Sequence, residues 1–436
     1  MRYRIVPLFL ALLACDSRKL LDVTDVEVAS PESLQGVAAL DVIYAGAVGD
    51  FGTAYAGNVG DADQVQMVAL FTDEYISAET FLTRTEVDRR GISEDNATMT
   101  EAMREIQKGR AASDFASDRF LILGFPNDVR RAETMNLAGL AIVIMAENYC
   151  SGVPLSRLLP SGAVEFGAPR TTAQLWDDAI AKFDSSLALT GTSAATAQAA
   201  QRNLASVGRG RALLNAGRVQ EAASAVASVG TNFTYRIAYS ANTTRENNAV
   251  WVFQRTSNRY AVADREGLNG LPYRSEGDSR APALTPSVGA VGFDGSTPMF
   301  YQNKFPLRDS AIPVATGTEA RLIEAEAALQ RGDLITFGAK ISEVRAFHGL
   351  SAAAIPSNAA AQVDLLFRER AYTMWLTAHR LGDLRRLVRQ YGRAQSAVFP
   401  SGAYHKGGTY GTDVNWIIPL DERNNPLFKG CLDRNA

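Results

Sequence analysis

Two stretches of this 436-residue sequence bring aromatic rings together with charged and amide side chains. The first is LFTDEYISAETFLTRTEVDRR, and the second covers the loops from Trp251 to Tyr301. A sugar ring has apolar C–H faces and hydroxyl edges, so a glycan site needs flat aromatic surfaces beside groups that form directed hydrogen bonds. A cleft for a peptide uses similar rings together with charged ends. The candidate ligand-binding residues are Asp73, Glu74, Tyr75, Arg84, Trp251, Tyr260, Tyr273 and Tyr301.

Each aromatic ring in this set has an alternative role in the protein core. Phe71 and Phe253 lie in the same two stretches, but their apolar neighbours favour core packing, so they are left out of the set. The sequence therefore marks two regions for ligand contact without deciding which rings face the ligand.

The sequence contains no recognisable catalytic motif. Neither a G-x-S-x-G nor an H-E-x-x-H motif occurs, and the chain has three histidines and three cysteines. We expect no catalytic residue, no metal and no cofactor. His379 is expected to form structural hydrogen bonds rather than act as a base. The segment GDADQ lacks the later glycine and glutamate of a calcium loop.

The overall charge is close to neutral, with 44 Lys and Arg against 47 Asp and Glu. A nucleic-acid partner would need a concentrated basic patch, which this balance does not suggest. No apolar run long enough to cross a bilayer is expected after the N-terminal segment.

The N-terminus has the layout of a secretory signal, with Arg2 and Arg4 before a short apolar run. The run ends in Leu-Leu-Ala-Cys, a pattern similar to the bacterial lipobox, in which the cysteine is acylated. We predict a signal peptide over 1–14, lipid attachment at Cys15 and a tether over 15–34. A plain signal peptide is the alternative.

The other two cysteines, Cys150 and Cys431, form an even pair in a chain expected to leave the reducing cytoplasm. A disulfide between them would join the C-terminus to the end of a central helix. Two unpaired buried thiols are the alternative.

Helical periodicity dominates the rest of the chain. Apolar residues at three- and four-residue steps predict helices over 98–118, 131–149 and 171–189. Segments 204–229 and 319–346 each predict a helix, a glycine-containing turn and a second helix, the plan of a degenerate tetratricopeptide hairpin. Residues 231–315 are expected to be mostly irregular, apart from a short strand in AVWVFQ.

Three motifs occur in an order that resembles the SusD/RagB family. RERAYTMWLTAHRLGDLRRL resembles its signature helix, WIIPLDERNNPLFKG its closing motif, and ENYCSGVPLS its helix-then-G-x-P-L element. The matching positions are Glu369, Arg370, His379, Arg380, Asp383, Leu384, Arg385, Arg386, Pro419, Glu422, Asn425, Pro426, Tyr149, Gly152, Pro154 and Leu155. Thr373 and Thr377 depart from the family's usual glutamates, and Leu381 from its usual aromatic.

The resemblance implies a mostly α, SusD-like domain over 35–436, in which helical repeats support an irregular ligand-binding region over 231–315. It implies a surface-exposed, lipid-anchored outer-membrane protein that delivers a glycan or peptide oligomer to a SusC-like TonB-dependent transporter. Asp16, directly after the lipobox cysteine, instead fits the enterobacterial rule for inner-membrane retention. The alternative function is a tetratricopeptide-type scaffold lipoprotein without a nutrient ligand.

Overall fold

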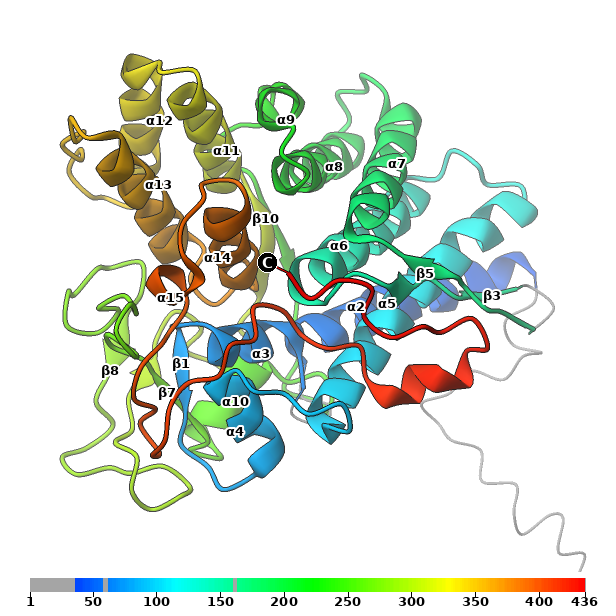
Figure 1. Cartoon of the computed structure of the whole chain (residues 1–436). Helices are drawn as coiled ribbons and strands as arrows, with labels where there is room; N and C mark the ends of the chain where they lie inside the picture. The colour runs from blue at the N-terminus through cyan, green and yellow to red at the C-terminus, as the bar shows by residue number, and fades with distance from the viewer. Residues whose placement is uncertain (1–35, 58–61, 160–162, 436) are drawn as a thin grey trace, which may run out of the picture.

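The structure is a computed structural model that describes residues 36–57, 62–159 and 163–435 (Figure 1). The predicted signal peptide, the lipid-attachment site Cys15 and the tether lie outside the described residues.

Helices form most of the described chain, which confirms the mostly α fold class. Those of the N-terminal half are η1 (Val37–Ala39), α2 (Leu40–Ala56), α3 (Gln64–Phe71), α4 (Leu82–Arg89), α5 (Ala97–Ile122), α6 (Val129–Asn148), α7 (Thr172–Thr190) and α8 (Thr196–Asn215). Those that follow are α9 (Val219–Val226), α10 (Ala249–Arg255), α11 (Gly317–Gln330), α12 (Leu334–Phe347), α13 (Ala359–Thr373), α14 (Arg380–Arg389), α15 (Gln395–Val398) and η2 (Leu420–Asn424).

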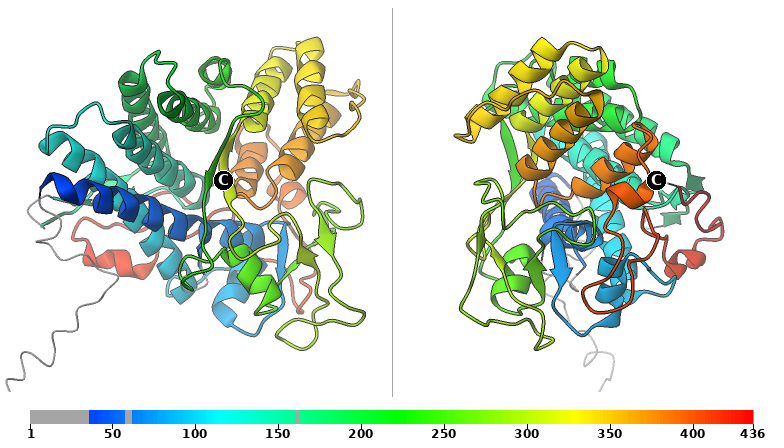
Figure 2. Two further views of the ribbon diagram at one scale, coloured as in Figure 1. Left: turned by 180° about the vertical axis from the view of Figure 1, so that it is seen from behind. Right: turned by 60° about the vertical axis from the view of Figure 1, so that its left-hand side comes forward.

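The strands of the described residues pair antiparallel, two by two. They are β1 (Tyr75–Ser77) with β7 (Tyr260–Val262), β10 (Ile312–Thr316) with β6 (Thr234–Ile237), β2 (Val153–Pro154) with β5 (Pro169–Arg170), β3 (Arg157–Leu158) with β4 (Val164–Glu165), and β8 (Ala283–Leu284) with β9 (Tyr301–Gln302). The β6–β10 ribbon lies between the α6–α9 helices and the α11–α14 helices (Figure 2).

The three predicted long helices are confirmed as α5, α6 and α7. Local caps fix where they begin: the Asn96 side chain accepts from the Met99 N–H, and Thr171 with Gln174 forms a capping box. Most of α6 is buried, as its nearly continuous apolar sequence predicts for a central helix.

Two helical hairpins, α8–α9 and α11–α12, confirm the predicted repeat segments. Gly217 and Gly332 turn each hairpin with φ of 79° and 74°. A Cβ at Gly210 would lie 2.5 Å from Val226 Cγ1, so a small residue is needed where α8 meets α9. Arg321 on α11 donates to the Val229 carbonyl at 2.9 Å and links the hairpins.

One helix of the described residues, Val37–Ala56, is long and apolar enough by length and composition to cross a membrane. The sequence prediction overlooked this run. The helix packs so closely along α5 that a Cβ on Gly109 would lie 3.0 Å from Phe51 Cα. Phe51 is fully buried, so this helix contributes to the core.

The predicted strand in AVWVFQ is wrong, because this segment forms α10. The Asn248 side chain caps the helix by accepting from the Trp251 N–H at 3.1 Å. Helical spacing buries Val250 and Phe253 on one face. A short apolar run does not distinguish a helix from a strand by periodicity alone.

The family-signature segment forms two helices rather than one. Between α13 and α14, Leu376 and Ala378 have φ of 55° and 59°, which breaks the helix. Side chains from distant elements satisfy the freed backbone groups: the Leu376 N–H donates to Glu74 Oε1 at 3.0 Å, and Tyr55 donates to the Thr377 carbonyl at 2.9 Å. We call residues 370–386, with the groups paired to them, the α13–α14 junction.

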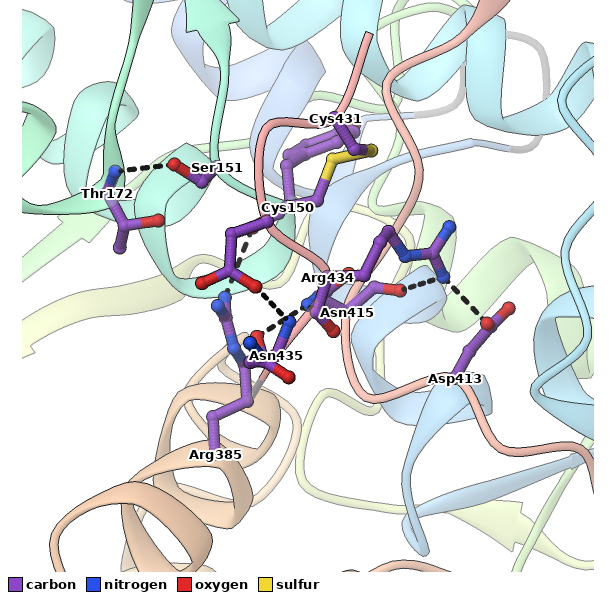
Figure 3. Close-up of a disulfide and its surroundings, with 11 residues drawn as sticks. Cys150, Ser151, Thr172, Arg385, Asp413, Asn415, Cys431, Arg434 and Asn435 are labelled. Carbon is purple, nitrogen blue, oxygen red and sulfur yellow. Dashed lines mark hydrogen bonds and ion pairs between the residues drawn. A yellow bond between two sulfur atoms is a disulfide. The ribbon is translucent and has the colours of Figure 1, made fainter.

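The predicted disulfide is present: Cys150 bonds to Cys431, with the two Cα atoms 5.6 Å apart (Figure 3). Cys150 lies two residues beyond α6, so the bond joins the C-terminal tail to a central helix. Arg385, drawn beside it, donates to the Glu147 and Tyr149 carbonyls at 2.6 and 3.2 Å. A buried arginine of the signature motif therefore caps the C-terminus of α6.

Candidate functional site

Three of the predicted ligand-binding tyrosines lie in the core. Tyr75, Tyr260 and Tyr273 have no exposed surface. The rings of Tyr75 and Tyr260 stack across the β1–β7 pair with centroids 6.3 Å apart, and Tyr273 stacks on Trp375 at 6.0 Å. In this structure all three rings therefore pack in the core and are not accessible from the surface.

Asp73 and Glu74 are also buried, and both turn toward the α13–α14 junction. Arg380 donates to the two carboxylate oxygens of Asp73 at 2.6 and 2.8 Å. Burial raises the pKa of Glu74 to about 8. In this structure both carboxyl groups pair with groups of the junction instead of facing the solvent.

Arg84 is buried beneath the surface, with an ion pair to Glu79 at 2.7 Å. Its guanidinium lies 4.8 Å from the ring centroid of Phe81 and 5.8 Å from that of Phe253. Arg84 therefore supports an exposed ring rather than lying at the surface itself. Phe253 and Phe71 are core residues, as the sequence predicts.

Trp251 and Tyr301 remain half-exposed, and both are fixed in place. The indole N–H of Trp251 donates to the Pro306 carbonyl at 2.8 Å. The hydroxyl of Tyr301 donates to Asn258 Oδ1 at 2.5 Å, and the Arg255 guanidinium lies 4.6 Å from its ring centroid. Because Trp251 and Arg255 are one turn apart on α10, they share a face of this helix.

The surface continues to two phenylalanines that the sequence prediction missed. Phe81 and Phe293 are 48% and 54% exposed, and the Arg259 guanidinium lies 5.0 and 4.6 Å from their ring centroids. The Phe293 N–H donates to the Asn258 carbonyl at 2.8 Å, which connects this group to Tyr301.

These contacts connect a set of neighbouring residues, which we call the aromatic–arginine strip. Its members are Phe81, Trp251, Arg255, Arg259, Phe293 and Tyr301. The elements that carry it, including α10, β7 and α4, lie together at the end of the molecule away from α12 (Figure 1). Its rings provide flat apolar faces, and its guanidiniums provide directed donors at the ring edges.

A local signal for Phe293 exists in the sequence GFDG. The Asp294 side chain accepts from the Ser296 and Thr297 N–H groups at 2.9 and 2.8 Å, forming a tight turn. A Cβ on Gly292 would lie 2.5 Å from the Ala78 carbonyl oxygen. The tight packing at Gly292 and the turn at Asp294 fix the backbone on both sides of Phe293, whose ring is exposed to solvent.

His379 is a structural residue, as predicted. It is 5% exposed, its Nδ1 lies 2.9 Å from the Thr377 hydroxyl, and its Nε2 lies 3.3 Å from a Glu319 carboxylate oxygen. Within the described residues, no group of three or more His, Cys, Asp or Glu side chains is placed to hold a metal ion.

Comparison with known proteins identifies the fold. No protein-family model and no curated protein matches the sequence. A SusD superfamily protein from Bacteroides thetaiotaomicron superposes with a TM-score of 0.66 at 14% identity, covering 90% of this chain and 99% of its own.

Two further solved structures are similar to the same extent. A SusD-like carbohydrate-binding protein from Bacteroides vulgatus has a TM-score of 0.66 at 13% identity, covering 90% of this chain and 97% of its own. A laminarin-binding SusD-like protein has a TM-score of 0.65 at 14% identity, covering 91% and 99%. The resemblance seen in the sequence motifs is therefore confirmed at the level of the fold.

Proposed function

We propose, starting from the SusD-like fold of this chain, that the protein binds an oligosaccharide on the aromatic–arginine strip. The observation that carries the proposal is the set of accessible rings at Phe81, Trp251, Phe293 and Tyr301, each beside a guanidinium. Rings fixed before binding lose little conformational entropy when a sugar stacks on them.

The similar structures support a glycan over a peptide as the ligand. One of them is described as carbohydrate-binding and another as laminarin-binding. The arginines of the strip are also consistent with a glycan ligand, because Arg255 and Arg259 can donate hydrogen bonds to sugar hydroxyl groups. Arg259 is also paired with buried Glu79 at 2.6 Å, which holds its guanidinium in place beside the rings.

We further propose that the protein is a lipoprotein of the outer membrane, attached through Cys15, and that it delivers its ligand to a SusC-like TonB-dependent transporter. The hairpins α8–α9 and α11–α12 would form the docking face, since stacked helical hairpins present an extended surface. Ile335 on α12 is 88% exposed and is available for such a contact. Replacing Cys15 by Ala should leave folding intact and release the protein from membranes, whereas continued sedimentation with membranes would contradict the anchor.

The ligand is tested with glycan and peptide arrays, followed by calorimetry with oligosaccharides of laminarin. Trp251→Ala should weaken glycan binding at least about tenfold, because it removes the largest ring of the strip. Leu268→Ala is the matched control, since Leu268 is 80% exposed and lies outside the strip.

Glycan binding that is unchanged in Trp251→Ala would place the site elsewhere. Binding to the peptide array alone would make the ligand a peptide. Binding to neither array would favour the alternative function, a scaffold without a nutrient ligand.

A further inference from the structure

A pocket of about 370 Å³ lies beside the β6–β10 ribbon, and none of its described lining residues belongs to the aromatic–arginine strip. Its walls come from the ribbon, the loop 304–311 and the end of α12. Three basic side chains line it, Arg236, Lys304 and His348, with hydroxyl groups from Ser310 and five threonines. None of the described residues that line it carries a carboxylate. Its size is that of a pocket for a small-molecule ligand.

Lys304 is held at the wall of this pocket by a hydrogen bond from its ammonium to the Trp375 carbonyl at 2.6 Å. An ammonium has three donors, so this bond leaves capacity for a ligand. Burial lowers the pKa of Lys304 to about 8, so most of it is charged at neutral pH. Glu74 favours the charged form of Lys304 only when Glu74 is itself ionised, while Arg236 and Arg280 oppose the charged form.

Arg236 is an exposed residue of β6 and adds a second positive charge at the rim. Within the described chain it has no ion-pair partner. It stands opposite Pro313 in the ribbon, and Pro313 also lines the pocket. Its guanidinium provides a planar set of donors suited to a carboxylate or a sulfate.

His348 follows α12 and supplies a polar atom that the fold leaves unused. Its Nε2 is buried and has no hydrogen-bond partner within the described structure. Burial, together with Arg280 and Lys304, lowers the pKa of His348 to about 4, so the imidazole is neutral at pH 7. An unpaired buried polar group costs free energy, which a hydrogen bond from a ligand would offset.

A second basic pocket of the molecule shows what a self-neutralised site looks like. This pocket of about 460 Å³ is lined by Arg110, Arg170 and Lys182, among others. Asp114 pairs with Arg110 and Lys182 at 2.8 and 2.5 Å, and Asp178 pairs with Arg170 at 2.5 Å. The cations of this second pocket already have counterions. The described residues that line the β6–β10 pocket, in contrast, include no carboxylate to pair with its cations.

We propose that the β6–β10 pocket binds an oxyanion, a carboxylate or a sulfate, carried on a small polyhydroxylated ligand such as a sugar acid. Lys304 and Arg236 hold the anion, and the hydroxyl-bearing wall receives the sugar hydroxyls. This site shares no residue with the aromatic–arginine strip, and the proposal does not rest on the proposed function.

The test is calorimetry on the purified protein with sodium glucuronate, sodium sulfate and glucose at constant ionic strength. Glucuronate should bind and glucose should not. Arg236→Gln should weaken glucuronate binding at least about tenfold, because it removes a charged donor. Arg89→Gln is the matched control, an exposed arginine outside this pocket, and it should bind glucuronate like the unchanged protein.

Two more measurements keep the outcomes separable. Phe81→Ala, a strip variant whose ring lies against Arg84 and Arg259, should leave glucuronate binding unchanged, so failure of the strip and failure of this pocket are distinguishable. Affinity should fall as the pH rises through about 8, where Lys304 loses its proton, and Lys304→Met should remove this pH dependence.

Equal binding of glucose and glucuronate, absence of binding to both anions, or full affinity in Arg236→Gln would each overturn the proposal. Sulfate binding that Arg236→Gln abolishes, without glucuronate binding, would support the oxyanion site and assign it to an inorganic anion.

Discussion

Arginine serves the α13–α14 junction and the aromatic–arginine strip in opposite ways. At the junction, fully buried Arg386 pairs with Glu326 and with Asp383, and Arg370 donates to both carboxylate oxygens of Asp383 at 2.9 Å. On the strip, the guanidinium of partly buried Arg259 lies against the rings of Phe81 and Phe293.

The difference separates a region that holds the fold from a region free to bind. A buried ion pair tolerates no change in one partner, since the other charge is left in the protein interior. Exposed rings contribute little to folding because much of their apolar surface stays in water. The family-signature motif therefore lies at the junction, whereas the strip carries no motif.

The largest expected effect comes from removing the charge at the centre of the junction. Although burial opposes it, Arg370 and Arg386 hold the pKa of Asp383 well below its usual range. Asp383→Asn leaves both guanidiniums without their shared counterion, so we expect a loss of about 3–5 kcal/mol in the free energy of unfolding. Urea denaturation followed by circular dichroism measures it.

The matched control for that change is Asp364→Asn. Asp364 pairs with Arg393 at 2.8 Å, but its side chain is 66% exposed. Its replacement should cost less than about 1 kcal/mol. Similar losses in the two variants would show that burial is not what makes the junction sensitive.

An effect of intermediate size is expected on the pH dependence of the free energy of unfolding when the Glu74 carboxyl group is removed. Burial raises its pKa from 4.5 to about 8, so between these values the folded protein holds a proton that the unfolded chain releases. This contribution is present below the unfolded pKa and is lost as the pH rises through about 8. Glu74→Gln should remove it, changing the slope of stability against pH by up to about 1.4 kcal/mol per pH unit.

Urea denaturation of both proteins at several pH values between about 5 and 8 measures this slope. Glu165→Gln is the matched control, because Glu165 is an exposed residue of β4, and it should leave the slope of stability against pH unchanged. Parallel stability curves for Glu74→Gln and the unchanged protein would contradict a proton held at the junction.

The smallest effect on folding is expected on the strip. Phe81→Ala should change the free energy of unfolding by less than about 1 kcal/mol, because the ring is 48% exposed. Glycan affinity should nevertheless fall by roughly two- to tenfold, the equivalent of one aromatic contact. Calorimetry and urea denaturation on the same variant separate the two quantities.

Leu284→Ala, at a residue that is 43% exposed on β8, is the control and should alter neither quantity. If Phe81→Ala costs as much stability as Asp383→Asn, the distinction between the two regions fails.

Local sequence predicted the elements whose stability is largely local. The periodicity and caps of α5, α6 and α7 were sufficient, and so were the glycine turns of the two hairpins. The pairing of Cys150 with Cys431 followed from their being the two cysteines left after Cys15. The SusD-like fold followed from motifs that lie in order along the chain.

The exposure of a given side chain could not be predicted in the same way. Tyr75 is buried because Tyr260, far along the chain, stacks on it, and Asp73 is buried because Arg380 reaches it. The break between α13 and α14 likewise depends on Glu74 and Tyr55, which accept from and donate to its backbone.

The sequence by itself determined the long helices α5, α6 and α7, the hairpins, the cysteine pair and the resemblance to a fold, since each depends on residues close together, on simple counting or on motif order. Only the tertiary structure decided which aromatic rings and charges face the solvent. The physical reason is that burial is a property of the partners that long-range packing brings to a side chain, and those partners are hundreds of positions away in the sequence.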